Sequence, residues 1–178
     1  MNEQQRMLAD MAGGLFAELG PHAAMAQDWA AIEQVALTSL LVPENAGGFG
    51  GSWQDALIVF RLAGYHALAL PMVEATIAAG ITACTDGRGT IAQHAEGELA
   101  NGRFTGLIRG AALAEGAKFL VAPAPGGGTM TLDATGAKIE TAYSIAGEAR
   151  DTLHLVSAPA RLENIDVLAL GAFARVAQ

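Results

Sequence analysis

Apolar residues in the first half of the chain recur at the spacing of amphipathic helices. The first predicted helix covers Gln5–Leu19, because its apolar residues follow one another at intervals of three and four: Leu8, Met11, Leu15 and Leu19. Gly20-Pro21 should end this helix. A second helix is predicted over Asp28–Leu37, with Asp28 as its N-cap.

Two further helices are predicted before residue 85. Ser52 is a typical N-cap, and Asp55 stands three residues later, where a capping box needs an acceptor. Pro71 should begin the last helix, since proline is tolerated in the first turn. The apolar faces of these two helices are formed by Leu57, Ile58, Leu62 and Tyr65 and by Val73, Ile77 and Ile81.

The pattern changes after Cys84. Thr85–Gly89 is a cluster of turn residues, and the segments after it are short, favour β-structure and are separated by Gly or Pro. Pro125–Gly128 has the composition of a hairpin turn. The strands predicted from this pattern are Phe104–Ile108, Lys118–Ala122, Met130–Leu132, Lys138–Thr141 and Thr152–Val156.

These elements predict an α+β protein with two domains. Residues 1–84 should form an N-terminal α-helical domain, and residues 85–163 a small antiparallel β-barrel domain. Residues 164–178 are expected to be the start of a truncated C-terminal helix, because Leu168–Gln178 has the composition of a helix that has just begun.

Composition and charge narrow the classes of function. The chain has 178 residues, of which 52% are hydrophobic and 16% charged, so it can bury a core. A net charge of −8 without a Lys/Arg cluster argues against nucleic-acid partners. Neither a basic n-region with an apolar h-region nor a run of about 18 apolar residues is present, and Cys84 is the only cysteine. We therefore expect a soluble, cytoplasmic protein without a membrane partner.

Signatures of catalytic or metal chemistry are absent. The glycines of Gly47–Gly51 lack both the βαβ context of a dinucleotide-binding loop and the Lys-Ser/Thr of a phosphate-binding loop. The four histidines are scattered, which gives no metal site. Cys84 has no His or basic neighbour in sequence. Glu96 and Glu98 lie in a polar stretch that we interpret as a solvated loop.

One segment is specific enough to indicate a family. Leu40–Gly51 (LLVPENAGGFGG) resembles the "(L/I)-x-(V/I)-P-E-x-x-G-G-x-G" segment of the acyl-CoA dehydrogenases. The resemblance covers nearly the whole chain. Later segments that resemble the family in the same order are Phe60–Gly64, Pro71–Gly80, Leu99–Gly110, Ala114–Val121, Ile145–Leu155 and Leu168–Gln178.

The resemblance implies an FAD-dependent enzyme whose catalytic part lies elsewhere. In this family an acyl-CoA substrate loses a proton from its α carbon to a glutamate and a hydride from its β carbon to FAD. That glutamate belongs to a C-terminal four-helix domain, which is absent from this chain. No catalytic residue is therefore assigned here, and we expect this chain alone to be inactive.

The resemblance also implies a reduced flavin site. The family's "T-E-P-x-x-G-S-D" segment corresponds to Thr90–His94, which leaves Thr90 as the candidate cofactor-binding residue. The next flavin-contacting positions fall on Gly110–Ala112, which offer no side-chain donor, although backbone groups could contact the flavin. Thr90 could equally be an ordinary threonine at the start of a strand.

Two arrangements would accommodate these losses. The chain could belong to a bacterial heteromeric enzyme of the steroid type, or to a divergent homomer that binds FAD through its C-terminal domain. We favour the heteromer, with acyl-CoA dehydrogenase subunits as partners in the degradation of fatty acids or steroids. The alternative is a non-catalytic binding or assembly subunit on the same fold. An unrelated α+β domain would lack the β-barrel after residue 85.

Overall fold

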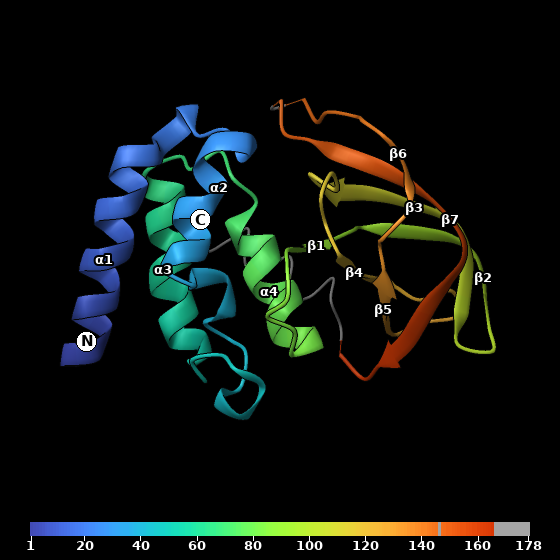
Figure 1. Ribbon diagram of the computed structural model, residues 1–178, viewed down its shortest axis with the longest axis horizontal. Coiled ribbons are helices and arrows are strands. Elements are labelled where there is room, and N and C mark those ends of the chain that lie inside the picture. Colours follow the sequence, from blue (N-terminus) through green and yellow to red (C-terminus); the bar gives the residue numbers. More distant parts are fainter. Residues whose placement is uncertain (146, 166–178) are drawn as a thin grey trace. The chain divides into compact units, whose positions relative to one another are not determined.

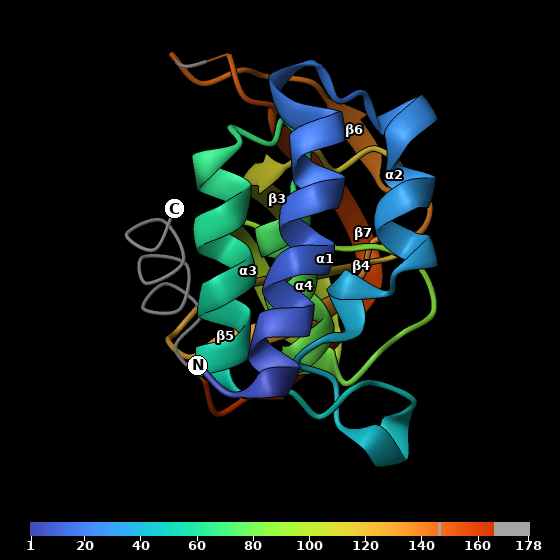
Figure 2. The ribbon, with the colours of Figure 1, turned by 90° about the vertical axis from the view of Figure 1, so that its left-hand side faces the viewer.

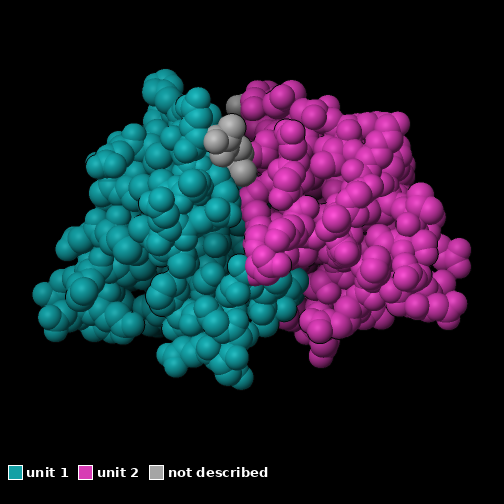
Figure 3. All heavy atoms as spheres, in the orientation of Figure 1, with its two compact units in different colours: residues 1–85, 172–178 teal, residues 86–171 magenta. Residues whose placement is uncertain are grey.

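The computed structural model describes residues 1–145 and 147–165 of the chain. The helix predicted within residues 164–178, over Leu168–Gln178, lies outside the described residues. Two compact units are present, one of which comprises Met1–Thr85 while the other begins at Asp86 (Figure 3). No helix in the described part of the chain combines the length and the apolar character needed to cross a membrane.

The first unit is built from α-helices joined by short 3₁₀ turns. Its helices are α1 (Glu3–Leu19), α2 (Met25–Gln34), α3 (Trp53–Tyr65) and α4 (Met72–Thr82). Helices α1 and α3 lie side by side (Figure 2). The largest buried side chains of this unit come from all four helices and the turns between them: Phe16, Ile32, Leu37, Val42, Phe60, Met72 and Ile77.

The helix boundaries follow the local capping chemistry. Helix α1 ends at Leu19, and the C-cap residue Gly20 has a φ of +54°, so the predicted stop is confirmed. Helix α2 begins at Met25, and the prediction that Asp28 is its N-cap was wrong. Asp28 instead lies inside the first turn, where its Oδ2 accepts the backbone N–H of Ala24 at 2.7 Å. A side-chain acceptor inside the first turn can satisfy a free N–H at the start of a helix, just as an acceptor at the N-cap position can. The sequence pattern therefore did not distinguish these two positions for Asp28.

The capping box at the start of α3 is confirmed. The backbone N–H of Asp55 donates to Ser52 Oγ at 3.2 Å, and the N–H of Ser52 donates to Asp55 Oδ2 at 2.8 Å. Hydrogen bonds from the Ser52 hydroxyl and then from the Gln5 amide lower the pKa of the Asp55 carboxyl below its ordinary value of 3.8.

The second unit is a curled, mixed sheet (Figure 1). Strands β1 and β4 pair in parallel, whereas the other pairs are antiparallel. The order along the sheet is β1-β4-β5-β7-β3-β2, with β6 also paired to β7. The strands are β1 (Gly89–Ile91), β2 (His94–Ala100), β3 (Arg103–Ala112), β4 (Phe119–Pro123), β5 (Thr129–Asp133), β6 (Lys138–Glu140) and β7 (Arg150–Glu163).

Helices followed by a half-closed sheet confirm the predicted α+β class. The core of the second unit lies inside the curl of the sheet and is formed mainly by aliphatic side chains. Its largest members come from β3, β4, β5 and β7: Phe104, Ile108, Leu120, Met130, Leu132, Leu153 and Leu155.

The prediction of a solvated loop at Glu96 and Glu98 was wrong. Both residues belong to β2, which pairs with β3 through a tight turn at Asn101-Gly102. Positive φ values of 50° and 70° at these two residues match the type I′ turn that suits the twist of a hairpin. Strand β2 ends the sheet, and all its residues are exposed or half-buried, so it lacks the alternation of buried and exposed positions that marks a strand.

The hairpin requires glycine at Gly97 and Gly106, which lie opposite one another. A Cβ on Gly97 would come within 2.3 Å of the Thr105 carbonyl oxygen, and one on Gly106 within 2.2 Å of the Glu96 carbonyl oxygen. Both residues have a φ of +154°. The two strands therefore approach each other more closely than any side chain would permit.

We predict that Ser52→Ala lowers the free energy of unfolding by about 1 kcal/mol at neutral pH, because the Asp55 N–H loses its acceptor. A carboxyl whose pKa is depressed in the folded state contributes stability above its ordinary pKa and loses it as pH falls through the folded pKa. Acidification below pH 3.8 should therefore destabilise the wild type more than the variant. Urea unfolding at several pH values measures this, with Ser52→Thr as the control that keeps the cap. Parallel pH profiles would contradict it.

We predict that Gly97→Ala destabilises the second unit by more than about 2 kcal/mol, through the steric clash and the strained φ. Gly14→Ala in α1 is the matched control, because nothing lies within 4 Å of a Cβ built there. That change should raise stability by about 0.5–1 kcal/mol, as expected for an exposed helical glycine. Thermal or denaturant unfolding compares the two, and equal effects would refute the close approach.

Candidate functional site

Thr90, the cofactor-binding residue expected from the sequence, lies in the middle of β1. Its side chain is fully buried, and it is opposite Leu120 in the parallel pair with β4. Its Oγ1 donates to the backbone carbonyl of Ala112 at 2.6 Å. Because a hydroxyl has one proton, Thr90 can serve a ligand only as an acceptor while this bond is kept.

Gly110–Ala112 form the end of β3 beside Thr90. Gly110 has a φ of +70° and is the extra residue of a β-bulge between Arg109 and Ala111. A Cβ on Gly110 would lie 3.3 Å from the Cβ of Gln93, so only glycine fits without displacing its neighbour. Ala111 and Ala112 are buried. Thr90, Ala111 and Ala112 are therefore packed within the chain itself, and of these four residues only Gly110, which is half-buried, reaches the surface.

Two buried charged residues at the same strand end were not found from the sequence. Asp151, only 2% exposed, accepts the backbone N–H of Ala114 at its Oδ2 at 2.7 Å. Arg88, only 5% exposed, donates through Nη2 to the backbone carbonyl of Glu115. For Asp151, the signal in the sequence is its place two residues before Leu153, where the alternating apolar residues of β7 begin. A charged residue at that place could equally lie outside the strand.

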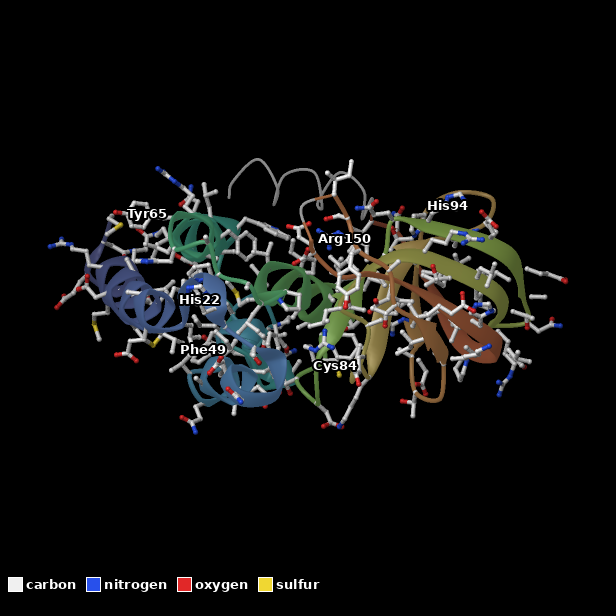
Figure 4. All side chains as sticks on the ribbon, turned by 90° about the horizontal axis from the view of Figure 1, so that it is seen from above. His22, Phe49, Tyr65, Cys84, His94 and Arg150 are labelled. Atoms are coloured by element: carbon white, nitrogen blue, oxygen red, sulfur yellow. The ribbon has the colours of Figure 1, made fainter. Side chains whose placement is uncertain are left out.

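The histidines lie on separate elements and belong to local ion pairs or surfaces. His94 Nε2 is 3.3 Å from Glu96 Oε1, which also lies 3.5 Å from Arg109 Nε. His154 Nε2 is 3.0 Å from Glu140 Oε1. All these side chains are partly or largely exposed, and Figure 4 labels His22 and His94 on different elements. Within residues 1–145 and 147–165, no three His, Cys, Asp or Glu side chains are grouped to hold a metal ion.

The Leu40–Gly51 segment is a structural turn. The backbone N–H groups of Phe49, Gly50 and Gly51 donate back to the carbonyls of Ser39, Val42 and Leu40 at 2.8–3.2 Å. A Cβ on Gly48 would lie 2.2 Å from the Val42 carbonyl oxygen. The segment therefore closes on its own backbone, which explains its glycines without a phosphate ligand.

The fold is shared with solved enzymes, although no protein-family model and no curated protein matches the chain. The ChsE4–ChsE5 complex from Mycobacterium tuberculosis matches with a TM-score of 0.76 and 17% identity. The Tcur3481–Tcur3483 steroid acyl-CoA dehydrogenase matches with a TM-score of 0.75 and 19% identity. The chain has the fold of the acyl-CoA dehydrogenases. The alignments cover 99% and 98% of this chain but 62% and 61% of the other two, so it spans about three fifths of their length.

More distant structures share the same acyl-CoA dehydrogenase-like fold. A glutaryl-coenzyme A dehydrogenase in complex with glutaryl-CoA matches with a TM-score of 0.60 and 12% identity, over 93% of this chain and 56% of that chain. XiaF from Streptomyces sp., in complex with FADH2 and glycerol, matches with a TM-score of 0.63 and 13% identity, over 90% and 52%. At these identities the likeness concerns the fold.

We predict that Thr90→Val lowers the free energy of unfolding by about 1–3 kcal/mol, because the buried Ala112 carbonyl loses its donor. Thr90→Ser keeps the hydroxyl and should lose less, namely the packing of one methyl group. Denaturant unfolding of both variants measures the difference. If valine proved no more harmful than serine, the Thr90–Ala112 hydrogen bond would contribute nothing to stability.

Proposed function

We propose that the chain is part of an acyl-CoA dehydrogenase-like flavoprotein, or a subunit of one, that acts on an acyl-CoA thioester with FAD. The observation that carries this proposal is the match over 99% of the chain to the ChsE4–ChsE5 complex. The order of the two units and the Leu40–Gly51 segment support the same proposal. Fold alone does not confer activity.

The flavin would lie near the end of β3. Gly110, which is half-buried, would offer backbone groups there, whereas Thr90, Ala111 and Ala112 are at most 2% exposed and would support that backbone from within the chain. Thr90 would do so through the hydrogen bond that its hydroxyl donates to the Ala112 carbonyl. When bound, the flavin would supply the hydride acceptor. The chain's own residues would bind and orient it.

The proton chemistry is proposed to lie outside this chain. No residue in the described part of the chain is assigned as the base. Asp151 Oδ2 already accepts the Ala114 N–H, and Glu96 Oε1 lies 3.3 Å from His94 Nε2 and 3.5 Å from Arg109 Nε. The base that removes the α-proton would then come from a further domain or from a partner subunit. The ChsE4–ChsE5 complex is an assembly of two named chains, which supports a heteromer.

The fold match also guides the choice of substrate and cellular role. Tcur3481–Tcur3483 is described as a steroid acyl-CoA dehydrogenase, which favours a steroid or fatty acyl-CoA thioester in bacterial lipid degradation. Such a role would place the protein in the cytoplasm. A non-catalytic assembly subunit is the second candidate, favoured by the commitment of the Thr90 hydroxyl to a backbone carbonyl.

Flavin uptake discriminates between these roles. The chain is purified alone and after co-expression with acyl-CoA dehydrogenase-like subunits encoded beside it, and the visible absorbance and released FAD are measured. We expect bound FAD in the complex and thioester-dependent bleaching of the flavin. Denatured and refolded protein offered riboflavin in place of FAD controls for specificity. A colourless complex that takes up no FAD would sink the enzyme proposal and leave the assembly role.

A further inference from the structure

Strand β2 leaves one edge of the sheet unpaired. It is the last strand of the sheet and pairs along its whole length with β3 alone (Figure 1). The parallel register of β1 with β4 places Pro123, the last residue of β4, level with Gln93, just before β2 begins. Among the described residues, no strand therefore pairs with the other side of β2, from His94 to Ala100.

The free backbone groups on this side come from alternate residues. The two-residue turn at Asn101-Gly102 makes Ala100 and Arg103 a hydrogen-bonded pair, and such pairs alternate along an antiparallel ladder. The pairs between them turn their N–H and C=O groups away from β3. On β2 these groups belong to Ala95, Gly97 and Leu99. No other segment of the described chain forms a hydrogen bond with them, so the row is available to an added strand.

The side chains of β2 give this edge two different faces. Ala95 and Leu99 are half-buried and pack against the core inside the curl of the sheet. Glu96 and Glu98 belong to the opposite face, because side chains alternate along a strand, and both are exposed. Glu98 lies opposite the neutral Thr105 and forms no ion pair in the described part of the chain. The exposed face of the edge is therefore acidic.

The two carboxylates oppose pairing of this edge with a second copy of itself. Two β2 strands related by a twofold axis at Gly97 would place Glu96 of one directly opposite Glu98 of the other. Like charges in such a pair are destabilising. Strand β2 contains no proline, lysine or bulge, which are devices that close an edge to any partner. Its charge therefore selects among partners and favours a strand that carries cations.

We propose that the free edge of β2 binds an extended segment of a different protein as an additional strand. The segment would carry Lys or Arg at alternate positions, facing Glu96 and Glu98. The residues between them would be apolar and would cover Ala95 and Leu99. Backbone hydrogen bonds would supply affinity, and the alternation of side chains would supply specificity. This interaction goes beyond the proposed function and does not require flavin.

The probe is a synthetic peptide of alternating valine and lysine with the length of β2, seven residues, blocked at its C-terminus and labelled with fluorescein. Its binding to the full chain is measured by fluorescence anisotropy. We expect saturable binding and slower amide hydrogen exchange at Ala95, Gly97 and Leu99. A peptide of the same composition, with its valines and lysines in two blocks, controls for simple attraction to a chain of net charge −8 and should bind at least about tenfold more weakly.

Two modified peptides test the backbone pairing. One is methylated on its valine nitrogens and the other on its lysine nitrogens, so that the methyl groups line opposite edges of the peptide. Only one set of methyl groups can face β2, where it removes donors and blocks the approach of the strands. The peptide with that set should bind at least about tenfold more weakly than the other.

Glu98→Lys tests the choice of partner by charge. This variant should bind the lysine peptide at least about threefold more weakly, and a peptide with glutamate in place of lysine more tightly, than the wild type does. Glu115→Lys is the matched control, because it makes the same change of charge at an exposed residue in the turn after β3, beyond the end that is far from Asn101-Gly102. It should bind both peptides as the wild type does.

Several results would overturn the proposal. These are the absence of saturable binding, equal affinities of the two methylated peptides, and a loss of binding in Glu115→Lys as large as that in Glu98→Lys. Sedimentation of the full chain tests the remaining occupant. A dimer that the lysine peptide dissociates would show that a second copy occupies the edge, and the proposal would fail.

Discussion

Hydrogen bonding along both edges of β7 holds the second unit together. One edge pairs with β3 from Arg150 to Pro159, and the other pairs with β6 near its start and with β5 at its end. A single 14-residue strand thus joins the strands on either side of it into one curled sheet. Leu153 and Leu155 of this strand belong to the core inside the curl of the sheet.

The pairing of β3 with β7 is kept in register by two bulges that cancel. One extra residue lies on β7 around Val156-Ser157, and the other is Gly110 on β3. Each bulge shifts by one residue the alternation of side chains between the two faces of the sheet. As a result, the next core residue after Leu155 on β7 is Ala158, and the next one after Ile108 on β3 is Ala111. The N–H of Ser157 donates to Thr105 Oγ1 at 2.9 Å, which satisfies the first irregularity. The second irregularity shapes the candidate site.

The same constraint links fold and proposed function. Because Ala111 pairs with Asp151 directly after the extra residue Gly110, the strand end inherits its geometry from the register of the whole sheet. In the helical unit, the start of α3 is fixed by its capping box, and the Leu40–Gly51 segment is fixed by backbone hydrogen bonds to the residues just before it and within it. The chain shares the acyl-CoA dehydrogenase fold with the ChsE4–ChsE5 complex at 17% identity, so the fold is kept although most side chains differ.

The sequence by itself determined the features that depend on neighbouring residues. The α+β order, the Ser52–Asp55 capping box, the stop at Gly20 and the strands with alternating apolar residues all follow from local spacing. Only the tertiary structure decided what depends on distant partners. Strand β2 forms although its side chains are mostly exposed, because β3 pairs with it. Thr90 could be named from the sequence, but its hydrogen bond to Ala112 could not. That bond, and those of Asp151 to Ala114 and of Arg88 to Glu115, join residues 22, 37 and 27 positions apart.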